Sequence, residues 1–134
     1  MHLIDANVWL EALFDTKYSD ESEKYLTAVG EGKYRALFDL FHVDAVAVSM
    51  ERAGLEKNQI RSFLTDLKRF RSLKLVDVGI YGRIKAASRK ENLELDDQIL
   101  LQIYQDYQVD FLVSYDTDFD QADEIKRREP GEIV

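Results

Sequence analysis

Short apolar runs and longer stretches with apolar residues at helical spacing follow one another along the chain. The short runs predict buried strands at residues 1–4, 34–38, 73–78 and 111–114, and the last three residues, 132–134, predict a short edge strand. The longer stretches predict helices over residues 7–13, 19–29, 39–53, 58–70, 80–90 and 95–107.

Strands that alternate with helices of about ten or more residues predict a parallel sheet, because parallel strands need a long crossover connection. We therefore expect an α/β fold, a three-layer α/β/α sandwich with a central parallel sheet of four to five strands. No internal repeat, low-complexity segment or linker interrupts the pattern, so residues 1–134 are expected to form a single domain.

Composition narrows the choice of function. The 134 residues are 46% hydrophobic and carry a net charge of −8, which argues against a disordered chain and against a protein that coats nucleic acid. A nuclease remains compatible, since it needs carboxylates at its centre and only local basic patches. No cysteine is present, which excludes disulfides and is consistent with a cytoplasmic location. Neither a secretory signal nor a membrane-spanning run is visible, so no membrane partner is expected.

Two aspartates stand at the ends of predicted strands. Asp5 closes the first strand, and Asp116 follows the strand at residues 111–114. In open parallel sheets, ligands bind beyond the carboxyl ends of the strands, so both side chains are candidates for a site. The alternative is a structural role, because Asp in a loop commonly accepts hydrogen bonds from nearby backbone N–H groups. Asp118 is likewise either a further acid of the site or a turn cap, and we favour the cap.

Asp44 is less expected, because apolar residues flank it in the run FHVDAVAV. Burying an unpaired carboxylate costs several kcal/mol, so we expect Asp44 to have a partner, for which His42 is a candidate. Glu51 lies seven residues further on and could take the place of Asp44. Helix-end acids are more often solvated.

A pair of acids, Asp96 and Asp97, opens the helix predicted over residues 95–107. Acids in a first turn commonly serve the helix dipole, which accounts for one of the two. Together with Asp5, Asp44 and Asp116 they would gather at one edge of the sheet, where their mutual repulsion calls for a divalent cation. Oxygen ligands suit Mg²⁺ or Mn²⁺, whereas two histidines and no cysteine make a structural zinc site unexpected.

In these motifs the sequence resembles the PIN-domain family, and within it the VapC-like toxins of toxin–antitoxin pairs. The resemblance rests on residues 3–7 (LIDAN), on Asp44 in the apolar helix, on residues 93–97 (LELDD) and on residues 112–119 (LVSYDTDF). The motif spacing selects Asp97 over Asp96. Two positions depart from the family pattern: Asp44 replaces the usual Glu, and Gln98 stands where a small residue is common.

The resemblance implies a metal-dependent endoribonuclease that acts on RNA with Mg²⁺ or Mn²⁺. The implied catalytic carboxylates are Asp5, Asp44, Asp97 and Asp116. Of these, Asp5, Asp97 and Asp116 would be the principal metal ligands, while Ser114 and Asn7 would orient the carboxylates. The family also implies an antitoxin partner and a homodimer. For these, apolar residues beyond the need of one small sheet are candidates, although core packing explains them equally well: Trp9, Leu10, Leu13, Phe14, Tyr25 and Leu26.

Basic and aromatic residues provide candidates for RNA contacts. The helix predicted over residues 80–90 is basic and precedes the Asp97 helix, so its cations could grip phosphates: Arg83, Lys85, Arg89 and Lys90. Tyr81 and Tyr115 could stack on bases, although packing in the core is the commoner role of aromatic residues.

Two alternatives remain open on sequence grounds. A PIN-like protein with a weakened site could serve as an RNA-binding or assembly module, and the shorter Asp44 favours that reading. A phosphotransfer enzyme or receiver domain could share the sheet, but residues 5–8 (DANV) lack the second Asp and the Thr of a haloacid-dehalogenase loop, and no receiver pattern is clear.

Overall fold

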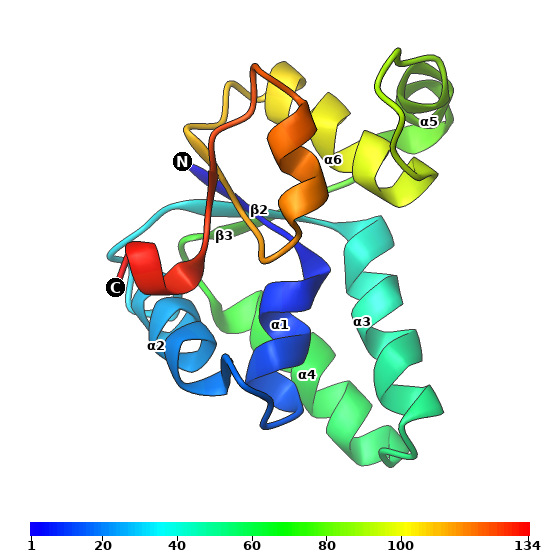
Figure 1. Ribbon diagram of the computed structural model, residues 1–134. Helices are drawn as coiled ribbons and strands as arrows, with labels where there is room; N and C mark the ends of the chain where they lie inside the picture. Colours follow the sequence, from blue (N-terminus) through cyan, green and yellow to red (C-terminus); the bar gives the residue numbers. More distant parts are fainter.

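The computed structural model describes all 134 residues, which form a five-stranded, all-parallel sheet in the order β3-β2-β1-β4-β5 (Figure 1). The strands are β1 (His2–Ile4), β2 (Ala36–Asp39), β3 (Leu73–Val76), β4 (Phe111–Val113) and β5 (Arg127–Arg128). In the centre of the sheet, Leu3 is in register with Leu37 on one side and Leu112 on the other. The first strand of the chain is therefore the middle strand of the sheet.

Helices connect the strands and cover both faces of the sheet (Figure 1). They are α1 (Ala6–Leu13), α2 (Ser19–Gly30), α3 (Leu40–Arg52), α4 (Lys57–Arg69), α5 (Gly79–Ala87) and α6 (Leu95–Asp106), together with the 3-10 helices η1 (Thr117–Gln121) and η2 (Pro130–Glu132). None of the helices has the length and apolar character needed to span a membrane.

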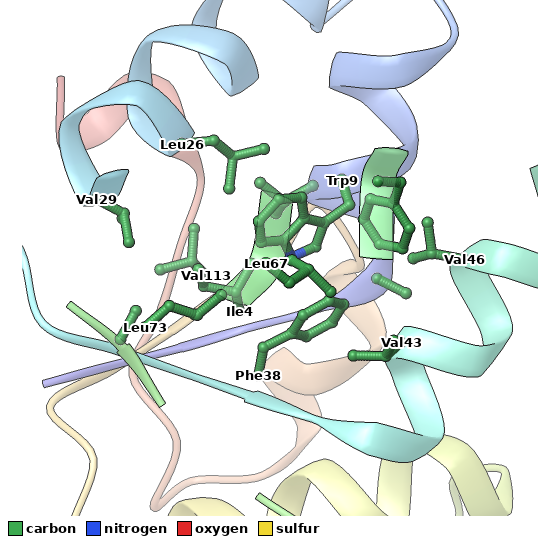
Figure 2. Packing of buried hydrophobic residues seen from close by; sticks show 14 of the residues in the cluster. Ile4, Trp9, Leu26, Val29, Phe38, Val43, Val46, Leu67, Leu73 and Val113 are labelled. Atoms are coloured by element: carbon green, nitrogen blue, oxygen red, sulfur yellow. The ribbon is translucent and has the colours of Figure 1, made fainter. Parts of the chain in front are cut away.

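The two faces of the sheet carry separate hydrophobic clusters because successive strand residues point to opposite sides. Ile4, Phe38 and Val113 pack in the larger cluster with residues of α1 to α4, part of which Figure 2 shows. Their strand neighbours Leu3 and Leu37 belong to the second cluster, which is built mainly with α6. The predicted three-layer α/β/α sandwich is thereby confirmed.

Trp9 of α1 is the centre of the larger cluster. Its ring stacks on that of Phe38, with the ring centroids 5.1 Å apart (Figure 2). The ring of Phe63 from α4 makes an edge-type contact with it, with the ring centroids 5.8 Å apart. Tyr25 and Leu26 of α2 are buried in the same cluster. Most of the apolar residues considered for a partner surface thus belong to the core, while Leu13 stays exposed.

The edge strand predicted at residues 132–134 is wrong. Pro130 starts the short helix η2 instead, and the side chains of Glu129 and Glu132 cap its first turn reciprocally. The edge strand is formed by Arg127 and Arg128, which pair with β4. Two consecutive arginines carry no apolar alternation, so sequence periodicity could not identify them as a strand.

Candidate active site

The carboxyl ends of the central strands β1 and β4 bring two of the predicted site residues to one edge of the sheet. Asp5 directly follows β1 and is the N-cap of α1, where its Oδ1 accepts a hydrogen bond from the backbone N–H of Ala6 at 2.7 Å. The structural role considered for Asp5 is therefore real. It occupies one carboxylate oxygen only, and the residue is 6% exposed.

A hydrogen-bond network holds the second oxygen of Asp5. Ser114 Oγ donates to Asp5 Oδ2 at 2.6 Å, and Asn7 Nδ2 lies 3.2 Å from the same oxygen. The Asn7 amide also bridges to β4, because its Nδ2 donates to Ser114 Oγ at 3.1 Å and its Oδ1 accepts the N–H of Tyr115 at 3.2 Å. Asn7 and Ser114 thus orient the Asp5 carboxylate, as expected of them.

Asp116 stands at the corner where β4 passes into η1. Its backbone N–H donates to Ser114 Oγ at 3.0 Å, and its side-chain Oδ1 accepts the N–H of Asp118 at 2.9 Å. Asp116 is therefore the cap of η1, and the expectation that Asp118 is the cap is wrong. Asp118 is exposed and faces the same pocket as Asp116.

Asp97 reaches this edge of the sheet from the first turn of α6. Its neighbour Asp96 accepts the Asp97 N–H at 2.9 Å, which is the structural role expected of one acid in the pair. The Asp97 carboxylate makes no hydrogen bond within the protein. Five acids and two amides surround a pocket of about 380 Å³ at this position. The lining residues are Asn92, Leu93, Glu94, Asp96, Asp97, Asp116, Asp118 and Gln121.

The electrostatics of these carboxylates show that they are neighbours. Burial, together with the charges of Asp96, Asp5 and Asp116, raises the pKa of Asp97 to about 7. Burial also raises the pKa of Asp5, against the lowering effect of the Ser114 hydrogen bond and of His42. Such raised values mark a cluster whose ionised form is unfavourable without a nearby cation.

A buried pair that the sequence did not reveal, Asp39 and His42, lies behind Asp5. Asp39 is the N-cap of α3, and its Oδ1 is 2.6 Å from His42 Nδ1, a close ionic contact that is not a well-aligned hydrogen bond. His42 Nε2 lies 3.9 Å from Asp5 Oδ1. Burial alone would lower the pKa of His42, but Asp39, Asp5 and Asp96 outweigh it and raise that pKa. The buried His42 ring therefore lies between the carboxylates of Asp39 and Asp5.

Asp44 does not share this environment. It is exposed on α3, makes no hydrogen bond or ion pair, and does not line the pocket. The expectation that Asp44 is buried and needs His42 as a partner is wrong, because Val43 and Val46 face the core while Asp44 points to the other side of the helix. Its predicted place in the catalytic quartet stays a prediction. Gln98, the other departure from the family pattern, is buried, and its side-chain amide donates to the backbone carbonyl of Glu91.

The donor set fits a hard divalent cation by its chemistry. Asp97 offers an unpartnered carboxylate, and Asp5 and Asp116 lie within its electrostatic range. Carboxylate oxygens are the ligands that Mg²⁺ and Mn²⁺ prefer. No three acidic or histidine side chains are as close together as the ligands of one ion. Asp5 and Asp116 each commit one carboxylate oxygen to a helix cap.

Two of the cations predicted to grip phosphates have other roles. Arg89 is nearly buried, with Nη2 bonded to Glu91 at 2.7 Å and to Glu124 at 2.8 Å. Arg83 pairs with Asp77 at 3.2 Å. Lys85 and Lys90 are exposed and make no ion pair.

Of the two tyrosines considered for base stacking, one is packed within the protein and the other is exposed. The Tyr115 ring stacks on Tyr18 with the centroids 4.5 Å apart, and its hydroxyl bonds Ser22 and Glu21. Tyr81 remains free, with 79% of its surface exposed.

Comparison with known proteins agrees with this architecture. The family model described as "PIN domain" matches residues 2–125, so the chain belongs to the PIN-domain family. No functionally curated protein matches the chain significantly.

Solved structures extend the comparison to the fold. The crystal structure of VapC20 from Mycobacterium tuberculosis, a toxin that cleaves the sarcin–ricin loop, superposes with a TM-score of 0.74 at 8% identity, over 91% of this chain and 95% of that one. A toxin–antitoxin complex from Klebsiella pneumoniae gives a TM-score of 0.69 at 21% identity, over 97% and 98% of the two chains. VapBC2 from Rickettsia felis, bound to a DNA fragment from its promoter, gives 0.70 at 12% identity, over 96% and 97%. The fold is thus that of VapC-like PIN-domain proteins.

Proposed function

We propose that the chain is a metal-dependent endoribonuclease of the VapC-like class, which hydrolyses RNA phosphodiester bonds with Mg²⁺ or Mn²⁺. The observation that carries the proposal is the meeting of Asp97 and Asp116 on one polar pocket at the carboxyl edge of the sheet, with Asp5 close to both. Family membership and the VapC-like fold support the same conclusion.

In this proposal Asp5, Asp97 and Asp116 hold the ion, and Asp44 completes the catalytic set, directly or through water. A bound divalent cation activates water and neutralises the charge that develops on the phosphoryl oxygens. Ser114 and Asn7 keep the Asp5 carboxylate in place, and the buried His42 offsets part of the negative charge. Because the pKa of Asp97 is raised to about 7, this carboxyl would have to be ionised to hold the ion, and ion binding would therefore strengthen as the pH rises.

Cleavage of a labelled single-stranded RNA tests the proposal. The wild type should cleave with Mn²⁺ or Mg²⁺ and not with EDTA, and Asp97→Asn should lose at least about 100-fold in rate, as expected when one ligand of a catalytic ion is lost. Asp123→Asn is a matched control, because Asp123 is an exposed acid outside the pocket and makes no side-chain hydrogen bond. Full cleavage by Asp97→Asn would refute the assigned ligand set.

A second candidate function is a PIN-like RNA-binding or assembly module without a working site. The exposed position of Asp44 and the absence of three acids at ligand distance favour it. Titration calorimetry with Mn²⁺ separates the two candidates. A nuclease should bind the ion stoichiometrically, whereas a module with a weakened site should give no saturable heat.

We further propose an antitoxin as protein partner. An apolar pocket of about 560 Å³ opens among α1, α2 and α4, away from the acidic edge. Trp9, Leu13 and Phe63 are among its lining residues, and an amphipathic helix could bury its apolar face there. Two of the similar structures are toxin–antitoxin assemblies, which supports such a partner here.

Co-expression with the protein encoded beside this chain's gene tests the partner. Leu13→Glu should abolish co-purification, while Leu64→Glu should preserve it. The two leucines are matched, with 41% and 40% of their surfaces exposed, but only Leu13 lines the pocket. Equal binding by both variants would place the partner elsewhere.

A further inference from the structure

Arg127 belongs to the two-residue edge strand β5, next to the corner that carries Asp116. Its guanidinium binds Asp120 with two parallel hydrogen bonds, Nε to Oδ1 at 2.9 Å and Nη2 to Oδ2 at 3.2 Å. The remaining nitrogen, Nη1, donates to the backbone carbonyl of Ser114 at 3.0 Å and lies 3.4 Å from Glu129. The Arg127 side chain is 14% exposed, whereas its partner Asp120 is 58% exposed.

The two main contacts of Arg127 enclose Asp116 in the sequence. Ser114 comes two residues before Asp116, and Asp120 lies four residues after it, in η1. The guanidinium of Arg127 therefore makes hydrogen bonds to both ends of the segment that presents the Asp116 carboxylate to the pocket. Asp116 also caps η1 through the Asp118 N–H, so the orientation of η1 and that of the carboxylate are linked.

The charge of Arg127 is used within the protein. Asp120 and Glu129 both pair with it, and the Arg127 hydrogen bond lowers the pKa of Asp120. A guanidinium suits this position because its rigid fork matches a carboxylate in two bonds while it donates a third elsewhere. A lysine ammonium is a point donor and cannot hold the same geometry.

We propose that Arg127 is a positioning residue that fixes the segment of residues 114–120 and thereby aligns Asp116 for ion binding. The inference rests on the proposed function, in which Asp116 is a metal ligand. Arg127 lies outside both hydrophobic clusters, so its removal should loosen this segment without unfolding the sheet.

The next residue along β5 supplies a matched control. Arg128 has its guanidinium 4.5 Å from the centre of the Phe111 ring, and its side chain makes no hydrogen bond to the corner. Only its backbone carbonyl does so, by accepting the Ser114 N–H at 3.1 Å, and a side-chain substitution leaves that bond in place. Arg127→Met and Arg128→Met remove the same charge from the same strand, but only the first removes the grip on Ser114 and Asp120. Arg127→Lys keeps the charge and loses the fork.

Two measurements test the inference on the full chain. Hydrogen exchange of the metal-free protein should be about tenfold faster in residues 114–121 of Arg127→Met, and unchanged in Arg128→Met. Mn²⁺ titration should give about tenfold weaker affinity for Arg127→Met, as for loss of an outer-shell partner, with an intermediate loss for Arg127→Lys. RNA cleavage should lose kcat and keep KM, because the Arg127 charge is already paired with Asp120 and Glu129 and is not free to bind a phosphate.

Three results would overturn the inference. If Arg127→Met binds Mn²⁺ as tightly as the wild type, residues 114–120 hold Asp116 in place without the hydrogen bonds of Arg127. An equal loss in Arg128→Met would reduce the effect to net charge. If the wild type itself binds no Mn²⁺ and cleaves no RNA, the proposed function fails and this inference fails with it, which the wild-type measurement reveals separately.

Discussion

Asp97→Asn should stabilise the metal-free protein, because it removes a carboxylate whose ionised form is unfavourable in the pocket. The pKa of Asp97 is raised from 3.8 to about 7. At ~1.36 kcal/mol per pKa unit this corresponds to ~4 kcal/mol of unfavourable free energy for the ionised form. Asp97 is only half-buried, so solvent screening reduces the expected gain to about 1–2 kcal/mol. In a chain of this size the melting temperature should rise by about 3–8 °C.

The gain should depend on pH with a definite sign. Well below pH 3.8, Asp97 is protonated in the folded and unfolded states, and it does not destabilise the fold. As the pH rises from 3.8 to about 7, the unfolded state ionises first while the folded state keeps its proton, so wild-type stability falls across this window and then levels off. Asparagine has no such window. The advantage of Asp97→Asn should therefore be larger at pH 8 than at pH 5.

Urea unfolding followed by circular dichroism, with EDTA present, measures this difference, and Asp123→Asn is the control. Addition of Mn²⁺ at 100 times its dissociation constant should then stabilise the wild type by ~2.7 kcal/mol and leave the variant behind, so that the order of stability inverts. The reasoning is refuted if Asp97→Asn is less stable than the wild type at pH 8 without metal, or if Asp123→Asn gains equally.

Two further predictions concern other parts of the chain. Burial and the nearby N-terminal ammonium lower the pKa of His2, so the folded state binds fewer protons than the unfolded state. The stability should therefore fall as the pH drops below about 6.5. In His2→Phe the urea midpoint should depend less on pH in this range, and an unchanged slope would contradict the assignment. The expected homodimer should use the exposed apolar face of α5, where Ile80, Tyr81 and Ile84 have 66%, 79% and 55% of their surfaces exposed. Ile84→Glu should then be a monomer by light scattering and keep its circular dichroism spectrum. A wild type that is itself monomeric would exclude the dimer.

The fold was predictable because the central strands keep the two-residue alternation of buried side chains and the main helices keep apolar residues at helical spacing. The central strands alternate between the two core faces, and helices α2, α4 and α6 begin and end within about one residue of their predicted bounds. Asp5 and Asp116 could be placed at one edge because parallel strands share a direction. The orienting role of Asn7 and Ser114, which the family resemblance implied, agrees with their hydrogen bonds at the strand ends.

The remaining features depend on side-chain direction and on contacts across the sheet. Asp44 lies among apolar residues in sequence, but the buried positions of α3 are Val43, Val46 and Met50, so the apolar residues on the outer side of the helix concealed its exposure. The pair of Asp39 and His42 meets Asp5 only through the packing of α3 beside α1. The Asp39 cap had a sequence signal, since Asp directly before a helix is a preferred N-cap.

The order of the strands has a consequence for how this chain is made. Of the five strands, β1 is translated first and is the middle strand of the sheet, and one of its two neighbours, β4, lies more than 100 residues later in the sequence. Asp5 therefore has neither Ser114 nor Asp116 beside it until those residues have been translated. A growing chain that lacks β4 cannot assemble the acidic edge, so an RNA-cutting activity at this edge would be silent until β4 has been made.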